Sequence, residues 1–267
     1  MRKKSINIVL ALSFSVLLGA ASTTHAAEAA SPHTFTGNMT LTSEYLYRGI
    51  AQTRGKPALQ GGFDYAHSSG LYAGVWASNV SWINDATAGA SAGLEIDIYG
   101  GYKGNLTSDW SYDLGVLTYN YPGSGKPSGA AQPDTTELYA ALNWKWLALK
   151  YSRSTGSLFG WTKTVGGGKT SGSDYLELNA NYDMGSGWGL TGHVGHQRVS
   201  GRSSANYTDY KLGASKDVGF GTVGLAYSAT NAKADCARAE DYCFVNTAGR
   251  TYDAGKGRVL LTFSKSF

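Results

Sequence analysis

The chain has 267 residues, and its 36 glycines, 18 tyrosines and 7 tryptophans against only 5 prolines favour many strands with aromatic edges. Its formal net charge of +4 includes three basic residues at the N-terminus, and removing them lowers the charge by three, to +1. A chain so close to neutral does not indicate a nucleic-acid partner. Its apolar residues, spread at every second position, exclude a bundle of membrane helices.

The N-terminus has the pattern of a secretory signal peptide. Basic residues at positions 2–4 precede an apolar run over residues 6–21, and small residues follow at 26–30. We expect residues 1–26 to be removed, with cleavage after Ala26 favoured over Ala29, leaving residues 27–267 as a single domain. A retained anchor is the alternative, but the run is shorter than the roughly 20 apolar residues that span a bilayer.

Beyond the signal peptide, apolar and polar residues alternate with the period of two that places successive side chains on opposite faces of a sheet. The first segment is the clearest, and its alternation continues to Arg48. About twelve strands are predicted, at residues 34–48, 59–65, 71–78, 94–103, 111–121, 137–146, 147–152, 175–182, 188–198, 207–216, 223–227 and 258–267.

The connections between these segments alternate between short and long. Short ones lie near residues 68, 105, 145, 185 and 218, and long ones cover residues 49–57, 82–92, 122–134, 155–173, 199–206 and 231–256. Outer-membrane barrels have short periplasmic turns and long extracellular loops. We therefore predict an all-β transmembrane antiparallel barrel in the outer membrane of a Gram-negative bacterium, in contact with its lipid. A soluble sandwich or lipocalin is the alternative.

The last strand ends on an aromatic residue, Phe267. A final strand of this kind resembles the signature with which bacterial barrels engage the barrel-assembly machinery, so we expect that machinery to be a partner. Lys265 interrupts the apolar face of this strand, but its stem can reach the membrane interface.

Charged side chains gather on the face opposite the apolar one, and we expect them to line the lumen. The predicted pore-lining residues are Glu44, Arg48, Asp64, Glu95, Asp97, Asp113, Glu137, Lys150, Glu177, His193 and Lys211. Glu95 and Asp97 lie two residues apart on one face, hence roughly 7 Å along the strand, and we expect them to set the ion preference. The alternative is a salt-bridged plug that holds a closed barrel together.

Several motifs that resemble chemical sites are discounted. The spacing G-x-G-x-x-G at residues 219–224 opens a strand, whereas a dinucleotide site requires a helix N-terminus. His67 falls in a predicted turn, His193 in the lumen and His196 on the outer face, so no nucleophile and base are brought together. No cluster has the spacing of metal ligands. We therefore predict no cofactor, no metal and no enzymatic activity, with an outer-membrane hydrolase as the less favoured alternative.

Cys236 and Cys243 lie in the longest loop of a chain expected to be exported. Such an environment favours oxidation, so we predict that the two form a disulfide.

Four segments carry a family resemblance: SEYLYRGI at residues 43–50, PALQGGFDY at 57–65, GLYAGVWASNV at 70–80 and EIDIYGGY at 95–102. Together they resemble the TorF family of porins, bacterial outer-membrane β-barrel proteins. The likeness covers about the first third of the mature chain in detail. It implies an outer-membrane channel but brings no established substrate or catalytic residue.

These features predict a porin, a passive diffusion channel for small hydrophilic solutes or ions. Barrels of about eight strands are filled by their own side chains, whereas those of sixteen to eighteen hold an aqueous channel. A barrel of about twelve strands lies between these cases, so its inward side chains decide. The alternative is a closed structural or surface-interaction barrel without a conducting pore.

Overall fold

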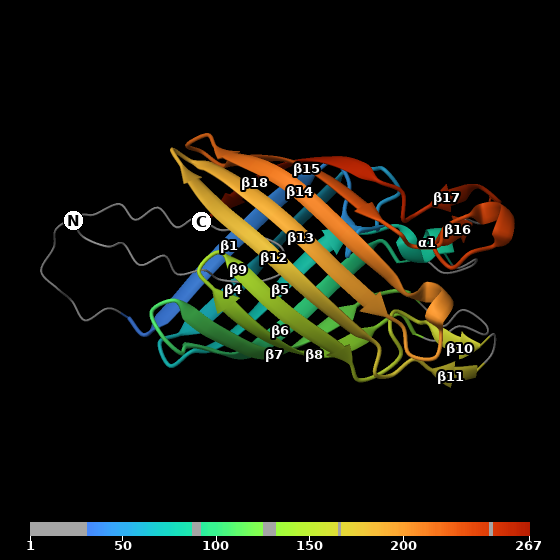
Figure 1. The fold of residues 1–267 in the computed structure, drawn as a ribbon, viewed down its shortest axis with the longest axis horizontal. Coiled ribbons are helices and arrows are strands. Elements are labelled where there is room, and N and C mark those ends of the chain that lie inside the picture. Colours follow the sequence, from blue (N-terminus) through green and yellow to red (C-terminus); the bar gives the residue numbers. More distant parts are fainter. Residues whose placement is uncertain (1–30, 87–91, 125–131, 165–166, 246–247) are drawn as a thin grey trace, which may run out of the picture.

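The chain forms a closed barrel of twelve antiparallel strands, seen in a computed structural model that describes residues 31–86, 92–124, 132–164, 167–245 and 248–267 (Figure 1). The strands of the ring are β1 (His33–Thr42), β4 (Ala58–His67), β5 (Leu71–Asn79), β6 (Leu94–Asn105), β7 (Trp110–Asn120), β8 (Thr135–Trp144), β9 (Leu147–Ser154), β12 (Asp174–Gly185), β13 (Trp188–Arg198), β14 (Tyr207–Asp217), β15 (Thr222–Thr230) and β18 (Arg258–Ser266). The predicted fold class is confirmed. The predicted signal peptide lies outside the described residues.

The ring closes between the first and last strands. β1 pairs with β4 on one side and β18 on the other. Phe267 extends this seam, because its backbone N–H donates to the Gly37 carbonyl at 3.0 Å and its carbonyl accepts from the Gly37 N–H at 2.7 Å. No strand of the ring is left with an open edge, and closure of this kind is what allows strands to cross a membrane.

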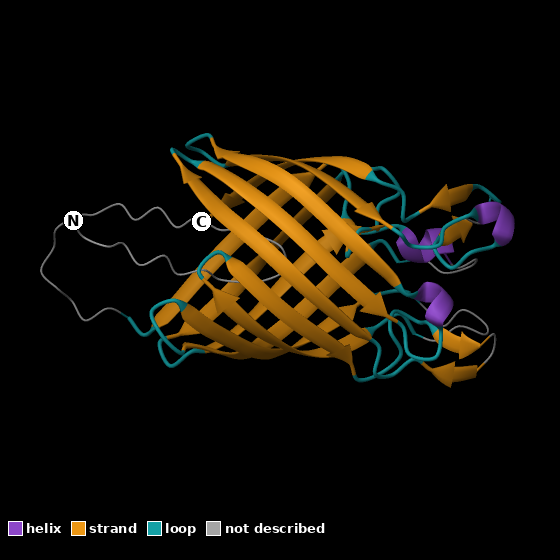
Figure 2. Ribbon diagram, in the orientation of Figure 1, coloured by secondary structure: helices purple, strands orange, loops and turns teal. Residues whose placement is uncertain are grey.

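The two ends of the barrel differ as the loop lengths predicted (Figure 2). Short turns and the C-terminus lie at one end, here named the turn end. The other, the loop end, carries the helix α1 (Trp82–Ala86) and the turns η1 (Ser203–Ala205) and η2 (Cys236–Arg238), together with the strands β10 (Thr162–Thr164), β11 (Gly167–Lys169), β16 (Cys243–Val245) and β17 (Thr251–Asp253). In the ranges described, none of the helices has the length and hydropathy of a membrane span.

The outer face of the barrel is apolar. Phe35, Leu212 and Val259 have exposed fractions of 76%, 71% and 66%, and large apolar side chains continue around the ring. Aromatic pairs lie beside the short turns, with centroids of Trp110 and Trp144 separated by 6.2 Å and similar pairs beside the other turns. An apolar band bordered by aromatic residues is the surface that a barrel presents to lipid.

The first strand corrects the sequence prediction, because it ends at Thr42 and not at Arg48. The chain then folds into a short hairpin of β2 (Leu46–Tyr47) and β3 (Ile50–Ala51), in which Tyr47 pairs with Ile50. Its tip, Arg48–Gly49, has φ values of 47° and 77°. Positive φ at both central residues is the requirement of the two-residue turn that suits a right-twisted hairpin. Residues 43–57, which contain this turn, are named the inner hairpin.

Candidate functional site

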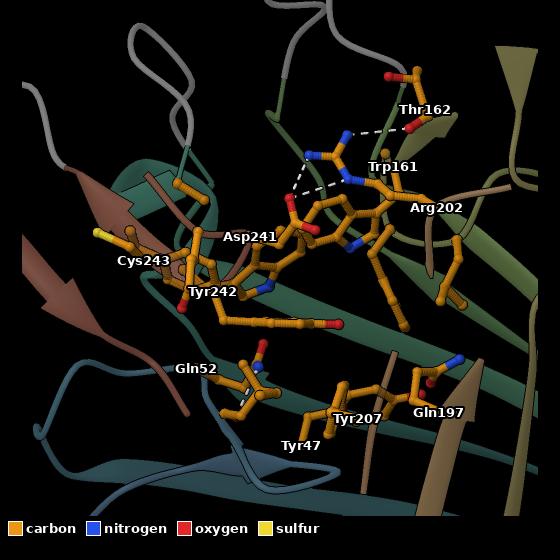
Figure 3. Close-up of a pocket in the computed structure, with 18 of the residues that line it drawn as sticks. Tyr47, Gln52, Trp161, Thr162, Gln197, Arg202, Tyr207, Asp241, Tyr242 and Cys243 are labelled. Carbon is orange, nitrogen blue, oxygen red and sulfur yellow. Dashed lines mark hydrogen bonds and ion pairs between the residues drawn. The ribbon is translucent and has the colours of Figure 1, made fainter. Parts of the chain in front are cut away.

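At the loop end the barrel holds a cavity of about 440 Å³. Its floor includes Tyr47 of the inner hairpin and Tyr207 of β14 (Figure 3). Residues of the loop between β15 and β18 form another part of the wall, among them Asp241 and Tyr242. The inner hairpin therefore lies between this cavity and the rest of the lumen.

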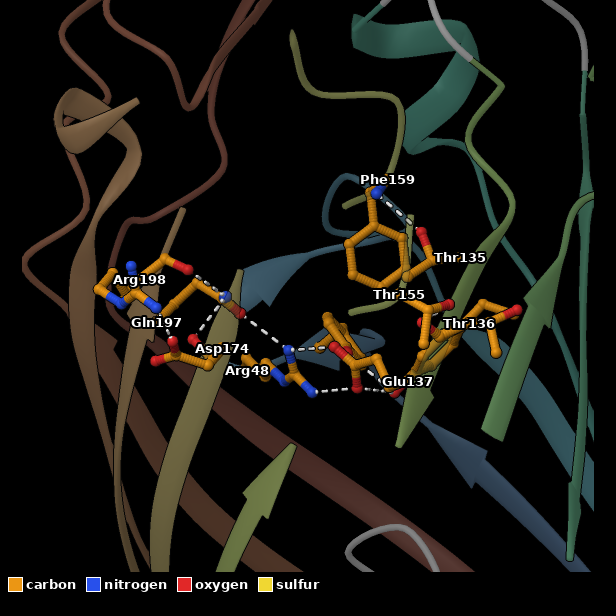
Figure 4. A network of polar contacts seen from close by, with 11 residues as sticks. Arg48, Thr135, Thr136, Glu137, Thr155, Phe159, Asp174, Gln197 and Arg198 are labelled. Atoms are coloured by element: carbon orange, nitrogen blue, oxygen red, sulfur yellow. Dashed lines mark hydrogen bonds and ion pairs between the residues drawn. The ribbon is translucent and has the colours of Figure 1, made fainter. Parts of the chain in front are cut away.

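The inner hairpin crosses the whole lumen. It is rooted between β1 and β4, whereas β9 and β12 lie opposite these strands in the ring of twelve. The Arg48 guanidinium donates to both carboxylate oxygens of Glu137 on β8, at 3.0 Å and 2.7 Å, and to Oε1 of Gln197 on β13 at 2.8 Å (Figure 4). It also lies over the ring of Tyr175 on β12, 4.1 Å from the centroid. Arg48 thus ties the hairpin to the far wall.

Gly49 brings the backbone of the hairpin tip against that wall. A Cβ at this position would lie 2.4 Å from Cγ2 of Thr230 and 2.8 Å from Cβ of Asp209, two residues on β15 and β14. Both the close approach and the φ of 77° require glycine here. The tip is therefore shaped to fit the opposite wall.

Tyrosines tie the hairpin to the adjacent wall. The hydroxyl of Tyr45 donates to Oε1 of Glu95 at 2.7 Å, and that of Tyr121 donates to Oε2 of the same carboxylate at 2.7 Å. The Tyr47 hydroxyl donates to that of Tyr119 at 2.9 Å. These contacts connect the hairpin with β6 and β7. Both oxygens of Glu95 accept hydrogen bonds from tyrosine hydroxyls, so this carboxylate helps to hold the hairpin against the wall.

Glu44 fixes the base of the hairpin. Its Oε1 accepts from the backbone N–H of Gly55 and from the hydroxyl of Tyr252, both at 2.7 Å. Its Oε2 lies 3.0 Å from Nε of Arg258 on β18. The two ends of the hairpin and the loop that precedes β18 are thus held by one carboxylate.

The predicted pore-lining residues lie in the inner hairpin and in the barrel strands, and they differ in burial. Glu44 and Arg48 belong to the inner hairpin and the others to barrel strands. Glu95, Asp97 and Glu137 are 1%, 0% and 1% exposed, so the acids expected to set the ion preference lie behind the hairpin and not on an open channel. Their role in permeation stays a prediction. Asp64, Lys150, Glu177, His193 and Lys211 are only partly buried, and Asp113 is buried.

Asp97 differs from the other buried acids. Neither of its carboxylate oxygens has a hydrogen-bond partner among the described residues, although the side chain is fully buried. An unpaired buried carboxylate is costly.

The lumen between the hairpin and the turn end is polar. The hydroxyl of Tyr99 donates to Asp64 at 2.5 Å, and His193 Nε2 lies 2.9 Å from the Asp209 carboxylate. Lys103 and Lys150 form no ion pair within 4.0 Å in the part of the chain that the structure describes, and Lys150 lies 4.3 Å from the ring centroid of Tyr139. Lys103 Nζ likewise lies 5.2 Å from the ring centroid of Tyr72, so this half of the lumen contains charged as well as neutral polar groups.

Two features of the site were missed by the sequence. The alternation of the first predicted strand places Tyr45 and Tyr47 with its apolar, lipid-facing residues, but they face inward. Gln197 and Tyr175, which hold Arg48, were not singled out. The sequence did contain one signal for the inner hairpin, the pair Arg48–Gly49. A glycine at the second position of a two-residue turn favours a β-hairpin.

The loop disulfide agrees with expectation, and the placement of one histidine does not. Cys236 and Cys243 are bonded, with 5.0 Å between their Cα atoms, so the predicted disulfide is confirmed. His67, expected in a turn, is the half-buried last residue of β4, whereas His193 faces inward and His196 is exposed on the outer face as predicted. Within the described ranges, no group of three His, Cys, Asp or Glu residues is placed to hold a metal ion.

The chain was compared with known proteins. A family model described as "Bacterial protein of unknown function (Gcw_chp)" matches residues 26–267. No curated protein sequence matches the chain. Three solved structures are similar: a KdgM porin (6% identity, TM-score 0.49, 88% of this chain and 98% of that one), a NanC porin (10%, 0.46, 86% and 98%) and the P. putida toluene transporter TodX (10%, 0.44, 90% and 91%).

Proposed function

We propose that this chain, which belongs to the Gcw_chp family of bacterial proteins of unknown function, is an outer-membrane channel for small hydrophilic solutes or ions whose lumen is constricted by the inner hairpin. The apolar outer band and its aromatic border support a position in the outer membrane. The resemblance to the TorF family of porins supports the same proposal. A channel of this kind requires no catalytic residue, because passage through the lumen is passive.

The observation that carries the proposal is the position of the hairpin. It lies between a polar half of the lumen that contains Lys103 and Lys150 and a cavity of about 440 Å³ at the loop end. One narrow, hydrogen-bonded segment thus crosses the lumen between them. A segment of this kind either narrows a pathway or closes it, and the strength of its contacts decides which state is populated.

One observation favours a closed structural barrel as the second candidate. The Arg48–Glu137 pair is buried, with side chains 8% and 1% exposed, and it fixes the hairpin across the lumen. A lumen filled with paired charges is what a barrel without a conducting pore requires. The two candidates differ in whether ions pass when the hairpin is docked or displaced.

Two glycines of the same hairpin allow a matched test. Gly49→Val places a side chain against Thr230 and Asp209, whereas Gly55→Val adds one where no heavy atom lies within 4 Å. Both glycines have positive φ, 77° and 71°, so both variants carry backbone strain but only the first prevents docking. Folded proteins, verified by the heat-dependent shift of barrels on electrophoresis, are recorded in planar lipid bilayers.

We expect small conductance steps from the wild type and from Gly55→Val, and larger steps from Gly49→Val. Equal steps from all three proteins would show that the hairpin is not the constriction. If neither the wild type nor Gly49→Val conducts, the closed barrel is the better account.

A further inference from the structure

We infer that the loop-end cavity is a binding site for a neutral saccharide. Its volume of about 440 Å³ lies within the roughly 300–1,000 Å³ of pockets that hold small molecules. The inner hairpin, α1 and four further connections between barrel strands contribute to its wall. A site assembled from so many segments at the outward mouth of a barrel is suited to recognise a solute. The inference does not depend on whether the lumen conducts.

Aromatic rings form much of the wall. Among the rings that line the cavity are those of Trp82, Tyr121, Phe159, Trp161, Tyr207 and Tyr242. They pack edge to face or tilted, with centroids of Trp161 and Tyr242 separated by 5.6 Å and those of Tyr207 and Tyr242 by 5.0 Å. Such packing fixes the rings before a ligand arrives. The C–H groups on one face of a pyranose pack well against a fixed aromatic surface.

Three charged residues line the wall: Arg202 and Asp241 form an ion pair, and the Glu240 carboxylate accepts from the backbone N–H of Asp235 at 2.9 Å. Arg202 donates to Oδ1 of Asp241 from Nη2 at 2.5 Å and from Nε at 3.2 Å, and its Nη1 donates to the Thr162 carbonyl at 3.2 Å (Figure 3). Its guanidinium also lies 4.6 Å from the Trp161 ring centroid. The charge of Arg202 is therefore compensated in place, and this wall does not select an anion.

Other polar groups line the cavity without carrying charge. Gln52 and Gln197 present amide groups that already make contacts within the protein, since Nε2 of Gln52 donates to the Ile50 carbonyl at 3.0 Å and Oε1 of Gln197 accepts from Arg48 at 2.8 Å. The indole N–H of Trp82 is buried and has no acceptor among the residues described. A purely apolar occupant would leave this N–H unpaired, which is costly for a buried donor. A ligand with many hydroxyl groups satisfies donors and acceptors alike.

The combination selects the ligand class. Fixed aromatic faces exclude a strongly hydrated ion, the carboxylates of Asp241 and Glu240 disfavour an acid, and the unpartnered indole N–H of Trp82 disfavours a hydrocarbon. A neutral saccharide has both an apolar ring face and many hydroxyls. The disulfide between Cys236 and Cys243 holds the loop that carries Asp241 and Tyr242, so one wall is fixed in advance.

The test is calorimetric titration of the folded, detergent-solubilised full chain. The probes are the neutral disaccharides maltose, cellobiose and lactose, with glucuronate as an anionic probe and 1-hexanol as an apolar one. Trp161→Ala removes a wall of the cavity, and Trp188→Ala is the matched control because Trp188 is 50% exposed on the outer face at the turn end. Phe159→Ala is a second cavity variant, in case the first fails to fold.

We expect at least one disaccharide to bind saturably, and Trp161→Ala or Phe159→Ala to weaken binding by roughly tenfold or more. Trp188→Ala should bind as the wild type does. The inference is overturned if no disaccharide binds to folded wild type, if the cavity variants leave binding unchanged, or if glucuronate or 1-hexanol binds in preference to every disaccharide.

Discussion

Removing Arg48 should release the inner hairpin from the far wall. In Arg48→Ala, the Glu137 carboxylate stays 1% exposed and loses both hydrogen bonds from the guanidinium, at 3.0 Å and 2.7 Å. Breaking a buried ion pair by removing one partner costs about 3–5 kcal/mol, because the other charge is left uncompensated. When the hairpin undocks, water reaches Glu137, so the free-energy cost of the unpaired charge destabilises only the docked state. The ratio of docked to undocked hairpin should drop by roughly a hundred to a few thousand.

Cysteine labelling measures this ratio directly. Ile50 lies beside the tip and is 5% exposed, and the two native cysteines are bonded to each other. A cysteine introduced by Ile50→Cys is therefore the only free thiol of the chain. Its reaction with a maleimide should be slow in the otherwise unchanged protein and much faster when Arg48→Ala is added.

Two further variants separate the ion pair from general damage. Arg198→Ala breaks an ion pair with Asp174 in which the arginine is 47% exposed, so its effect should stay within about 1 kcal/mol. The double variant Arg48→Met with Glu137→Leu leaves no unpaired ion, and it should label more slowly than Arg48→Ala. If Arg48→Ala labels at the same slow rate as its parent, the ion pair does not hold the hairpin and the reasoning fails.

Three more predictions concern other parts of the molecule. Leu178, 41% exposed on the outer face, should cost about 2–4 kcal/mol when changed to Arg, whereas Asn179→Arg on the inner face should be mild; equal losses in unfolding titrations would refute the assigned facing. Replacing Cys236 and Cys243 by Ser should destabilise their loop by about 2–3 kcal/mol in the chain-entropy model, visible as faster amide exchange confined to that loop. At Asp241, burial raises the carboxyl pKa, but hydrogen bonds from Arg202 and Ser204 outweigh it, so the pKa is lowered. The pairing of Asp241 with Arg202 therefore stabilises the loop above the ordinary carboxyl pKa of about 3.9, and this stability is lost as the pH falls through the lower folded-state pKa. Amide exchange should show this acid-dependent loosening in the wild type and not in Asp241→Asn.

The barrel itself could be predicted from the sequence because alternation is a local property. Whether a residue such as Leu178 faces outward follows from its immediate neighbours, and so does the length of each connection. The disulfide was predictable for a similar reason, since Cys236 and Cys243 share one loop of an exported chain.

The inner hairpin could not be predicted in this way. The alternation through Tyr45 and Tyr47 is the same for a strand in the wall as for one that turns into the lumen. What decides between them is the set of partners of Arg48, and Glu137 and Gln197 are 89 and 149 residues away along the chain. The burial of the lumen acids follows from the hairpin, so it too was beyond a local pattern.

The most direct test of the proposed channel compares conductance with and without the inner hairpin. Residues 45–52 are replaced by a short Gly-Ser linker, and the folded variant and wild type are recorded in planar lipid bilayers under the same salt gradient. The structure predicts small steps from the wild type and much larger ones from the shortened protein, because the segment that crosses the lumen is gone. A shortened protein that is folded and inserted yet passes no current would contradict the channel and establish a closed barrel.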